Sequence, residues 1–270
     1  MIRKFTSALL LFLCLPLYFW AQEPVEEPEA KQNPLTIDFG AKLKSRHVWN
    51  GWLSCNAWNI QPDLTISAYG LFFNAWAYTA LDHTLNSEID LTLGYTYGPI
   101  SLMYIDMFYP TENKKGAIDM LPGTSGKMNY FRYKNEDRGD IHQQMAMVRF
   151  NGIKYFPIDV TVGVFTFGDP KLTKDPVKNT VTVDSYNAYS MLIDFGYAHK
   201  LKTGQKLSYN LSVTPYEGSG FFADGLNVVN LKFGVQQPVK VTDNYSFRLE
   251  GELVMNPYRE NLYFVFGLGF

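Results

Sequence analysis

From Leu35 to the end of the chain, apolar and polar residues alternate with a period of two. In the run 89–97, for example, every odd-numbered residue is aliphatic or aromatic, whereas the even-numbered ones are acidic, small or hydroxylated. Successive side chains of a strand point to opposite faces of a sheet, so each run predicts a strand with one apolar and one polar face. About twelve such runs are found, at 35–45, 59–69, 71–80, 87–97, 100–109, 141–150, 158–168, 185–197, 205–215, 226–236, 244–255 and 261–270.

The connections between these runs alternate in length. Most even-numbered ones, such as Tyr69-Gly70 and Gly98-Pro99, are short, whereas the odd-numbered ones are long or polar. Hairpin strands alternate in direction, so all long connections fall at one end of the sheet, as in transmembrane barrels. We therefore predict an all-β fold: a transmembrane antiparallel up-and-down β-barrel of about 12 strands over residues 35–270. The long connections are 46–58, 81–86, 110–140, 169–184, 216–225 and 256–260.

Two soluble folds share this alternation. A β-sandwich has strands of about five or six residues, whereas these runs are nearer the roughly ten that a tilted strand needs to cross a membrane. A lipocalin-like barrel closes with about eight strands and keeps its apolar face inside. The chain also has 18 Tyr, 20 Phe and 5 Trp, and Tyr and Trp prefer the membrane–water boundary. Its net charge of −2 gives no electrostatic reason to expect nucleic acid.

The N-terminal part has the layout of a targeting segment. Basic residues precede a short apolar stretch that ends at Ala21, which predicts a secretory signal peptide over 1–21; a retained anchor helix is the alternative. Residues 22–34 are acidic and proline-rich, so we expect a solvated periplasmic leader. Cleavage removes Cys14 and leaves Cys55 as the only cysteine, which excludes an intramolecular disulfide and a cysteine-based metal site.

The end of the chain carries a first resemblance. Residues 263–270 alternate large apolar side chains with smaller ones and finish on an aromatic ring. They resemble the C-terminal assembly signal of bacterial outer-membrane proteins, which the barrel-assembly machinery reads. The resemblance implies that this machinery is a partner and that four residues carry the signal: Phe264, Phe266, Leu268 and Phe270.

A second resemblance covers the first 110 residues. The segments SRHVWNG (45–51), IQPDL (60–64) and NAWA (74–77), continued by 88–98 and 104–110, are similar to the opening of the TorF-type porins. This resemblance implies a barrel in the outer membrane of a Gram-negative bacterium, in contact with lipid and lipopolysaccharide. It also implies small solutes as partners.

The polar faces of the expected strands carry charges that would line the lumen of a membrane barrel. Acids outnumber bases towards the end with long connections, so a conducting lumen is expected to favour cations modestly. The alternative is that the acids pair with Lys42, Lys44 and Arg248, which would cancel the field and block the path. The lumen-lining candidates are Asp38, Lys42, Lys44, Asp63, Glu88, Asp90, Asp194, Lys232, Arg248, Glu250 and Glu252.

A search for chemistry gives no catalytic set. His142 lies near Asp140 and Ser125 along the chain, but there is no G-x-S-x-G elbow. A solvent-facing histidine near a loop base is the simpler interpretation. The acidic residues of 110–140 lack the spacing of a calcium loop. No catalytic residue, cofactor or metal is therefore expected, and we expect no enzyme. The other histidines are expected outside strands: His47 and His83 in or beside long loops and His199 in a short turn.

The function that these patterns favour is passive passage of small solutes through a polar lumen, as in a narrow porin. The alternatives are a non-conducting barrel that presents surface loops and, third, an outer-membrane enzyme. Roughly eight strands are just filled by side chains, whereas 16–18 leave an aqueous channel. About twelve strands fall between these cases, and the 110–140 connection could also fold inward, so the sequence leaves the alternatives open.

Overall fold

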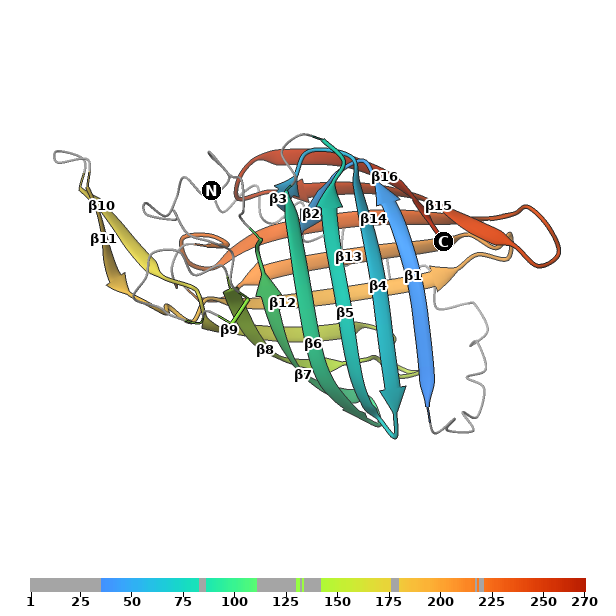
Figure 1. The fold of residues 1–270 in the computed structure, drawn as a ribbon, viewed down its shortest axis with the longest axis horizontal. Helices are drawn as coiled ribbons and strands as arrows, with labels where there is room; N and C mark the ends of the chain where they lie inside the picture. The colour runs from blue at the N-terminus through green and yellow to red at the C-terminus, as the bar shows by residue number, and fades with distance from the viewer. Residues whose placement is uncertain are drawn as a thin grey trace. The chain divides into compact units, whose positions relative to one another are not determined.

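The computed structural model describes residues 35–82, 86–110, 130–131, 133, 142–175, 180–216, 218 and 221–270. Every regular element in these residues is a strand, and twelve of the sixteen strands form a closed antiparallel barrel (Figure 1). The predicted fold class is therefore confirmed. The barrel strands are β1 (Thr36–Lys44), β4 (Asn59–Ala68), β5 (Leu71–Ala80), β6 (Ser87–Tyr97), β7 (Ile100–Phe108), β8 (His142–Phe150), β9 (Asp159–Phe167), β12 (Met191–Lys200), β13 (Lys206–Thr214), β14 (Asn227–Lys240), β15 (Ser246–Asn256) and β16 (Asn261–Gly269).

The predicted runs match the barrel strands to within a few residues, except for the eighth. That run was expected at 185–197, but β12 begins six residues later, at Met191. The backbone N–H of Ala188 donates to the Asp169 carbonyl (2.7 Å), and that of Ser190 donates to the Asp169 carboxylate (2.8 Å). These loop contacts occupy the backbone before β12, so the strand pairing starts later.

Some connections contain strands that the periodicity did not predict. The 46–58 connection contains a hairpin of β2 (His47–Trp49) and β3 (Trp52–Cys55), and the 169–184 connection contains most of a second hairpin, β10 (Lys171–Asp175) and β11 (Thr180–Ser185). The expectation for His199 was wrong as well. It lies in β12, where its ring stacks on Tyr209 with centroids 6.1 Å apart. The predicted signal peptide, the leader and the residues His83, Ser125 and Asp140 lie outside the described residues.

Tight turns join the strands at one end of the barrel. The β4–β5 turn is Tyr69-Gly70, with φ angles of 53° and 84°. Two consecutive positive φ angles make the hairpin turn whose twist matches that of the flanking strands. We call this end, with its short connections, the turn end, and the opposite end, with the long connections, the loop end.

The two faces of the barrel wall have opposite character. On β6, the outward residues Leu93 and Tyr97 are 56% and 79% exposed, whereas the inward Thr92 is 8% exposed. Soluble proteins bury apolar side chains and expose polar ones. The wall of this barrel reverses that order, with an apolar belt outside and polar residues inside. No helix among the described residues is long and apolar enough to cross a membrane.

The barrel closes through a short seam. β1 pairs with β4 along nine residues but with β16 along only three, which are Lys42 to Lys44 opposite Gly269 to Gly267. Two flanking backbone bonds of 2.9 Å, from Ser45 to Phe266 and from Phe270 to Ala41, extend the seam. The residues that resemble an assembly signal lie on the outward register of β16 and at its end: Phe264, Phe266, Leu268 and Phe270.

Candidate functional site: the barrel lumen

Charged side chains on β1 and β15 form a ladder of ion pairs along the lumen wall. Lys42 Nζ lies 3.4 Å from Glu250 Oε1, and Lys44 Nζ lies 3.8 Å from Glu250 Oε2 and 3.1 Å from Glu252 Oε2. The sequence offered two interpretations of these acids, an uncompensated field and pairing with lysines. The structure brings Glu250 and Glu252 into pairs, which run along the wall rather than across the lumen.

Glycines on the strand between β1 and β15 make this ladder possible. Gly267 and Gly269 of β16 face the lumen, beneath the lysine and glutamate side chains. A Cβ atom at Gly269 would lie 3.0 Å from Arg248 Nη2 and 3.3 Å from Glu250 Oε1, and one at Gly267 would lie 2.6 Å from the Leu43 carbonyl oxygen. Any larger residue would therefore crowd the ladder or the seam.

Other predicted lumen residues are spread around the wall. Asp63 of β4 accepts a hydrogen bond from Asn74 Nδ2 (3.1 Å), and Glu88 of β6 is buried. A pair that was not predicted joins Arg149 Nη2 to Asp159 Oδ2 at 2.9 Å. The rest share the inward register: Asp38 on β1, Asp90 on β6, Asp194 on β12, Lys232 on β14 and Arg248 on β15.

Towards the loop end, the lumen is filled by apolar side chains. A buried cluster joins residues of β7, β8, β9, β12 and β14 to the segment 221–223. Phe222 lies at its centre, stacked on Phe165 of β9 (5.7 Å between centroids) and tilted against Trp49 of β2 (5.7 Å). The wall residues come from five of the six neighbouring strands between β7 and β14, so the cluster packs against this half of the barrel wall. It consists of Met107, Met145, Phe165, Leu192, Phe222, Ala223 and Val229, with Trp49 and Phe221 packed against it.

The β2–β3 hairpin reaches into the lumen and contacts β13, β14 and β15. Its turn is Asn50-Gly51, with φ angles of 45° and 76°. Asn256 Nδ2 of β15 donates to the Gly51 carbonyl (3.2 Å), and Ser212 Oγ of β13 lies 3.4 Å from Asn50 Oδ1. A Cβ atom on Gly51 would lie 2.0 Å from the Val229 carbonyl oxygen, so only glycine fits there. We call residues 47–55 together with Phe221, Phe222 and Ala223 the plug.

The base of the hairpin is held by a neutral histidine. The His47 ring lies between Trp76 (5.0 Å) and Tyr78 (4.9 Å), and its Nδ1 atom is 3.3 Å from Gln61 Nε2. Burial and the nearby Lys44 ammonium lower the pKa of His47 to about 3. Because the amide nitrogen of Gln61 can only donate, Nδ1 accepts and the proton of the neutral ring is on Nε2.

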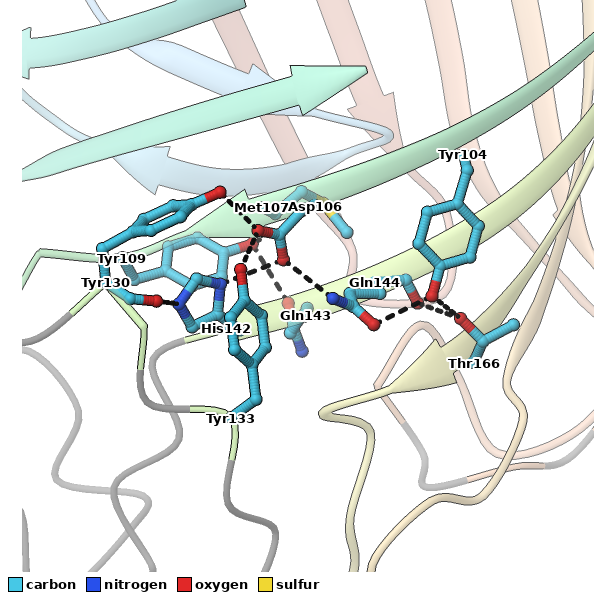
Figure 2. Close-up of polar contacts among 10 residues, drawn as sticks. All are labelled: Tyr104, Asp106, Met107, Tyr109, Tyr130, Tyr133, His142, Gln143, Gln144 and Thr166. Carbon is cyan, nitrogen blue, oxygen red and sulfur yellow. Dashed lines mark hydrogen bonds and ion pairs between the residues drawn. The ribbon is translucent and has the colours of Figure 1, made fainter. Parts of the chain in front are cut away.

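A second polar cluster lies on the outward register of β7 and β8 (Figure 2). Asp106 Oδ1 is 2.9 Å from His142 Nδ1 and accepts from Gln144 Nε2 at 3.2 Å. The neighbouring outward positions of β7 are apolar, and Leu102 is 55% exposed. The carboxylate partner of His142 is therefore Asp106, thirty-six residues away in the chain, which the sequence pattern did not indicate. The expectation of a solvent-facing histidine was wrong, because His142 is 0% exposed.

This outward cluster fastens a part of the 110–140 connection to the barrel wall. The hydroxyls of Tyr130 and Tyr133 both donate to Asp106 Oδ2, at 3.0 and 2.9 Å, and His142 Nε2 donates to the Tyr130 carbonyl at 2.8 Å. Both nitrogens of His142 thus contact oxygen atoms, which ties the ring to the Asp106 carboxylate and to the backbone of Tyr130. Tyr130 and Tyr133 lie outside the lumen, so the inward folding that the sequence left open does not apply to them.

The sequence reasoning missed the plug, although signals were present. Asn50-Gly51 is a strong hairpin signal, and the connections that contain Trp49, Trp52 and Phe221 are rich in aromatic residues. A solvated loop has no use for so many large rings, so their presence indicated packing. What they pack against depends on contacts between positions far apart in the chain.

No protein-family model matches this chain, and no curated protein matches it. A solved structure of OmpF from Salmonella typhi in complex with daunomycin is similar to it with a TM-score of 0.38 and 8% identity, over 87% of this chain and 97% of that one. The assignment to a closed twelve-stranded barrel rests on this chain's own strand pairing.

Proposed function

We propose that this chain is an outer-membrane barrel of the porin type, closed by its own plug in the state described here. The exposed apolar belt supports the membrane location, since its outward residues find a matching solvent in lipid. Tyrosines with hydroxyls near water are typical of both membrane boundaries, and at the turn end Tyr69, Tyr97 and Tyr155 are 71%, 79% and 84% exposed.

The outward cluster of β7 and β8 supports a boundary near the loop end. A charged side chain on the lipid face costs about 2–4 kcal/mol at the bilayer midplane and far less near the interface. The apolar belt of β7 ends at Tyr104, whose hydroxyl donates to Gln144 Oε1 at 2.8 Å. Asp106 and His142 follow, so this side of the membrane would end between Tyr104 and Asp106.

The observation that carries the proposed transport function is the contrast within the lumen. In the turn-end part, Arg149 and Asp159, which flank the short 151–157 connection, have side chains that are 41% and 38% exposed, so water reaches this section. The section under the loops is closed by residues such as Phe165 and Val229, which are 0% and 1% exposed. A wet polar lumen that ends at a plug made of connecting segments fits a narrow porin in its closed state.

The rival function is a non-conducting barrel that presents its loops. The burial of part of the plug favours it, with Cys55, Phe222 and Ala223 only 3%, 4% and 2% exposed, because a barrel with no solute to pass would be sealed in the same way. The two functions differ in one property, which is whether a path opens when the plug is removed.

Single-channel recording in a planar bilayer tests the proposal. Residues 47–55 are replaced by a short Gly-Ser linker between β1 and β4, and a second variant adds Phe221→Ser and Phe222→Ser. The matched control shortens the β10–β11 hairpin, which belongs to a long connection but not to the plug. We expect a largely closed native protein, a largely closed control and sustained current from both plug variants.

Folding is checked first, by the shift in gel mobility on heating that barrels show and by circular dichroism. If the plug variants fold but carry no current, the porin proposal fails and the loop-presenting barrel takes its place. If the control conducts as strongly as the plug variants, loop shortening in general opens the barrel and the role given to the plug is wrong.

A further inference from the structure

The turn between β15 and β16 contacts both parts of the plug. The guanidinium carbon of Arg259 lies 4.3 Å from the ring centroid of Trp52 in the β2–β3 hairpin. Arg259 Nη2 also donates to the carbonyl of Phe221, at 3.2 Å. Trp52 and Phe221 stack on each other, with centroids 5.5 Å apart and an interplanar angle of 17°. A single exposed side chain therefore holds the hairpin and the 221–223 segment together.

Neighbouring contacts fix the position of this turn. The backbone N–H of Arg259 donates to Asn256 Oδ1 (3.0 Å), and Asn256 Nδ2 donates to the Gly51 carbonyl. Tyr258 Oη donates to Asp224 Oδ2 at 2.7 Å, beside the 221–223 segment. The turn is thus tied to the hairpin on one side and to the segment on the other, and Arg259 lies over the place where they meet.

The environment of Arg259 differs from that of the lumen bases. Lys42, Lys44 and Arg149 each have a carboxylate within 4 Å, whereas in the part of the chain that the structure describes none lies that close to the Arg259 guanidinium. Its partners are a ring face and a neutral carbonyl. A carboxylate or phosphate can make two parallel charge-assisted bonds to a guanidinium, which are stronger than these neutral contacts.

We propose that Arg259 recognises an anionic solute at the loop end and that binding releases the plug. The inference rests on the proposed porin function and names its substrate class, small carboxylates or phosphates. In the closed state, Trp52 and the Phe221 carbonyl compete with the anion for the guanidinium. In a state with the plug released, the guanidinium is free, so the anion binds that state more tightly and raises its population.

Arg259 belongs to a turn at the loop end, and its charged group lies over the plug. A charge meant only to attract anions would act from any position around the mouth. A charge that also holds the closed state together couples binding to opening. Anion binding and opening then compete for the same interactions of one side chain.

The test measures the open fraction of single channels at constant ionic strength, with potassium succinate added on the loop-end side. Succinamide, which is uncharged and of similar size, is the control solute. We expect succinate to raise the open fraction of the native protein several-fold and succinamide to leave it unchanged. Inorganic phosphate, as a second probe, distinguishes a general oxyanion site from one that prefers carboxylates.

Variants of Arg259 and Trp52 separate the recognition of the anion from the contacts that hold the plug closed. Arg259→Gln removes both, so it should conduct more than the native protein without any anion and ignore succinate. Arg259→Lys keeps the charge but not the planar fork, so it should respond weakly. Trp52→Phe keeps the stacking on Phe221 and weakens the cation–π contact, so it should open at lower succinate. Lys240→Gln, at the turn end, is the matched loss of an exposed base and should respond as the native protein does.

The outcomes distinguish the two proposals. If the hairpin-deleted variant conducts but succinate leaves the native open fraction unchanged, the role of Arg259 is wrong and the porin function stands. An Arg259→Gln variant that responds to succinate like the native protein also overturns the inference. If the hairpin-deleted variant folds and carries no current, the porin function itself fails.

Discussion

The two halves of the lumen are built in different ways. Near the turn end, polar side chains on nearby strands pair with each other, as Arg149 does with Asp159 at 2.9 Å, and water reaches them. At the loop end, connecting segments from distant parts of the chain pack into an apolar core, with Trp49 against Phe222. The wall can therefore form from local strand pairing alone, whereas the plug needs the finished wall to pack against. Changes in the plug should alter closure, and changes in the wall should alter stability and selectivity.

The largest effect is expected from the addition of a single methyl group to the plug. Gly51→Ala places a Cβ atom 2.0 Å from the Val229 carbonyl oxygen, at a φ of 76°. The hairpin must leave its place or β14 must move, so we expect a large part of the current seen after removal of the hairpin. Single-channel recording measures the effect.

Gly98→Ala is the matched control. Gly98 also has a positive φ, of 54°, but a Cβ atom there meets nothing within 4 Å. Its cost should be limited to the left-handed backbone, about 1–2 kcal/mol, with no change in conductance. Equal currents from the two variants would mean that backbone strain, and not the seat of the hairpin, controls closure.

The next largest effect is expected in the wall. The double variant Glu250→Gln, Glu252→Gln leaves Lys44, whose side chain is only 12% exposed, without its two carboxylates. Breaking a buried pair costs about 3–5 kcal/mol, and we expect the lower part of that range because the lumen is partly wet. Urea unfolding in detergent measures the loss, and Lys240→Gln, which breaks an exposed pair, should cost less than about 1 kcal/mol.

The Glu250→Gln, Glu252→Gln variant also tests the ion selectivity of the lumen. In the barrel without the β2–β3 hairpin, the free lysines should move the reversal potential towards anion preference across a salt gradient. The native charges pair along the wall, so the modest cation preference expected from counting acids is reduced or absent. A strong cation preference that survives the double variant would contradict the role given to these pairs.

Lowering the pH should destabilise the packing around His47 at the base of the plug before it affects the barrel wall. The pKa of His47 is lowered from 6.5 to about 3, so between these values the unfolded chain binds a proton that the folded chain does not. Stability is complete above pH 6.5 and falls as the pH drops towards 3, by up to about 1.4 kcal/mol per pH unit. Unfolding midpoints at pH 7 and pH 4 should therefore differ less in His47→Gln than in the native protein. An unchanged pH dependence would show that other groups cause it.

The smallest effect on stability is expected at the end of the chain. Phe270→Ala removes a ring that is 51% exposed, and Leu262→Ala removes a side chain that is 59% exposed on the same face of β16. Both should cost little equilibrium stability, but only Phe270→Ala should lower the assembled amount in cells, if the terminal residues act as an assembly signal. Equal assembly of the two variants would remove the support for that signal.

The wall could be predicted from the sequence because its information is local. A period of two over about ten residues defines a strand and its two faces, and Tyr69-Gly70 or Gly98-Pro99 mark the turns. The eighth strand was misplaced because Asp169 takes the backbone bonds of Ala188 and Ser190, a contact between the two ends of the β9–β12 connection. The alternation of apolar and polar residues contains no information about such contacts.

The plug and the outward cluster could not be predicted for the same reason. Ser212 Oγ and Asn50 Oδ1 meet across 162 positions of the chain, and no pattern near either residue points to the other. Asp106 is an acid in the otherwise apolar outward register of 100–108, which was the one visible sign of its cluster. That sign indicated a special position without indicating His142 as its partner.

Thiol labelling tests whether the lumen is wet near the turn end and sealed beneath the loops. Cys55, the last residue of the plug hairpin, is 3% exposed, and Ser208→Cys in a Cys55→Ala background places a thiol on the inward face of β13 near the turn end. A charged maleimide applied to the folded protein in detergent should label the thiol at position 208 nearly as fast as a free thiol. It should label Cys55 at least a hundredfold more slowly, until the hairpin is released by Gly51→Ala. Comparable rates at Cys55 and position 208 in the native plug background would contradict the account.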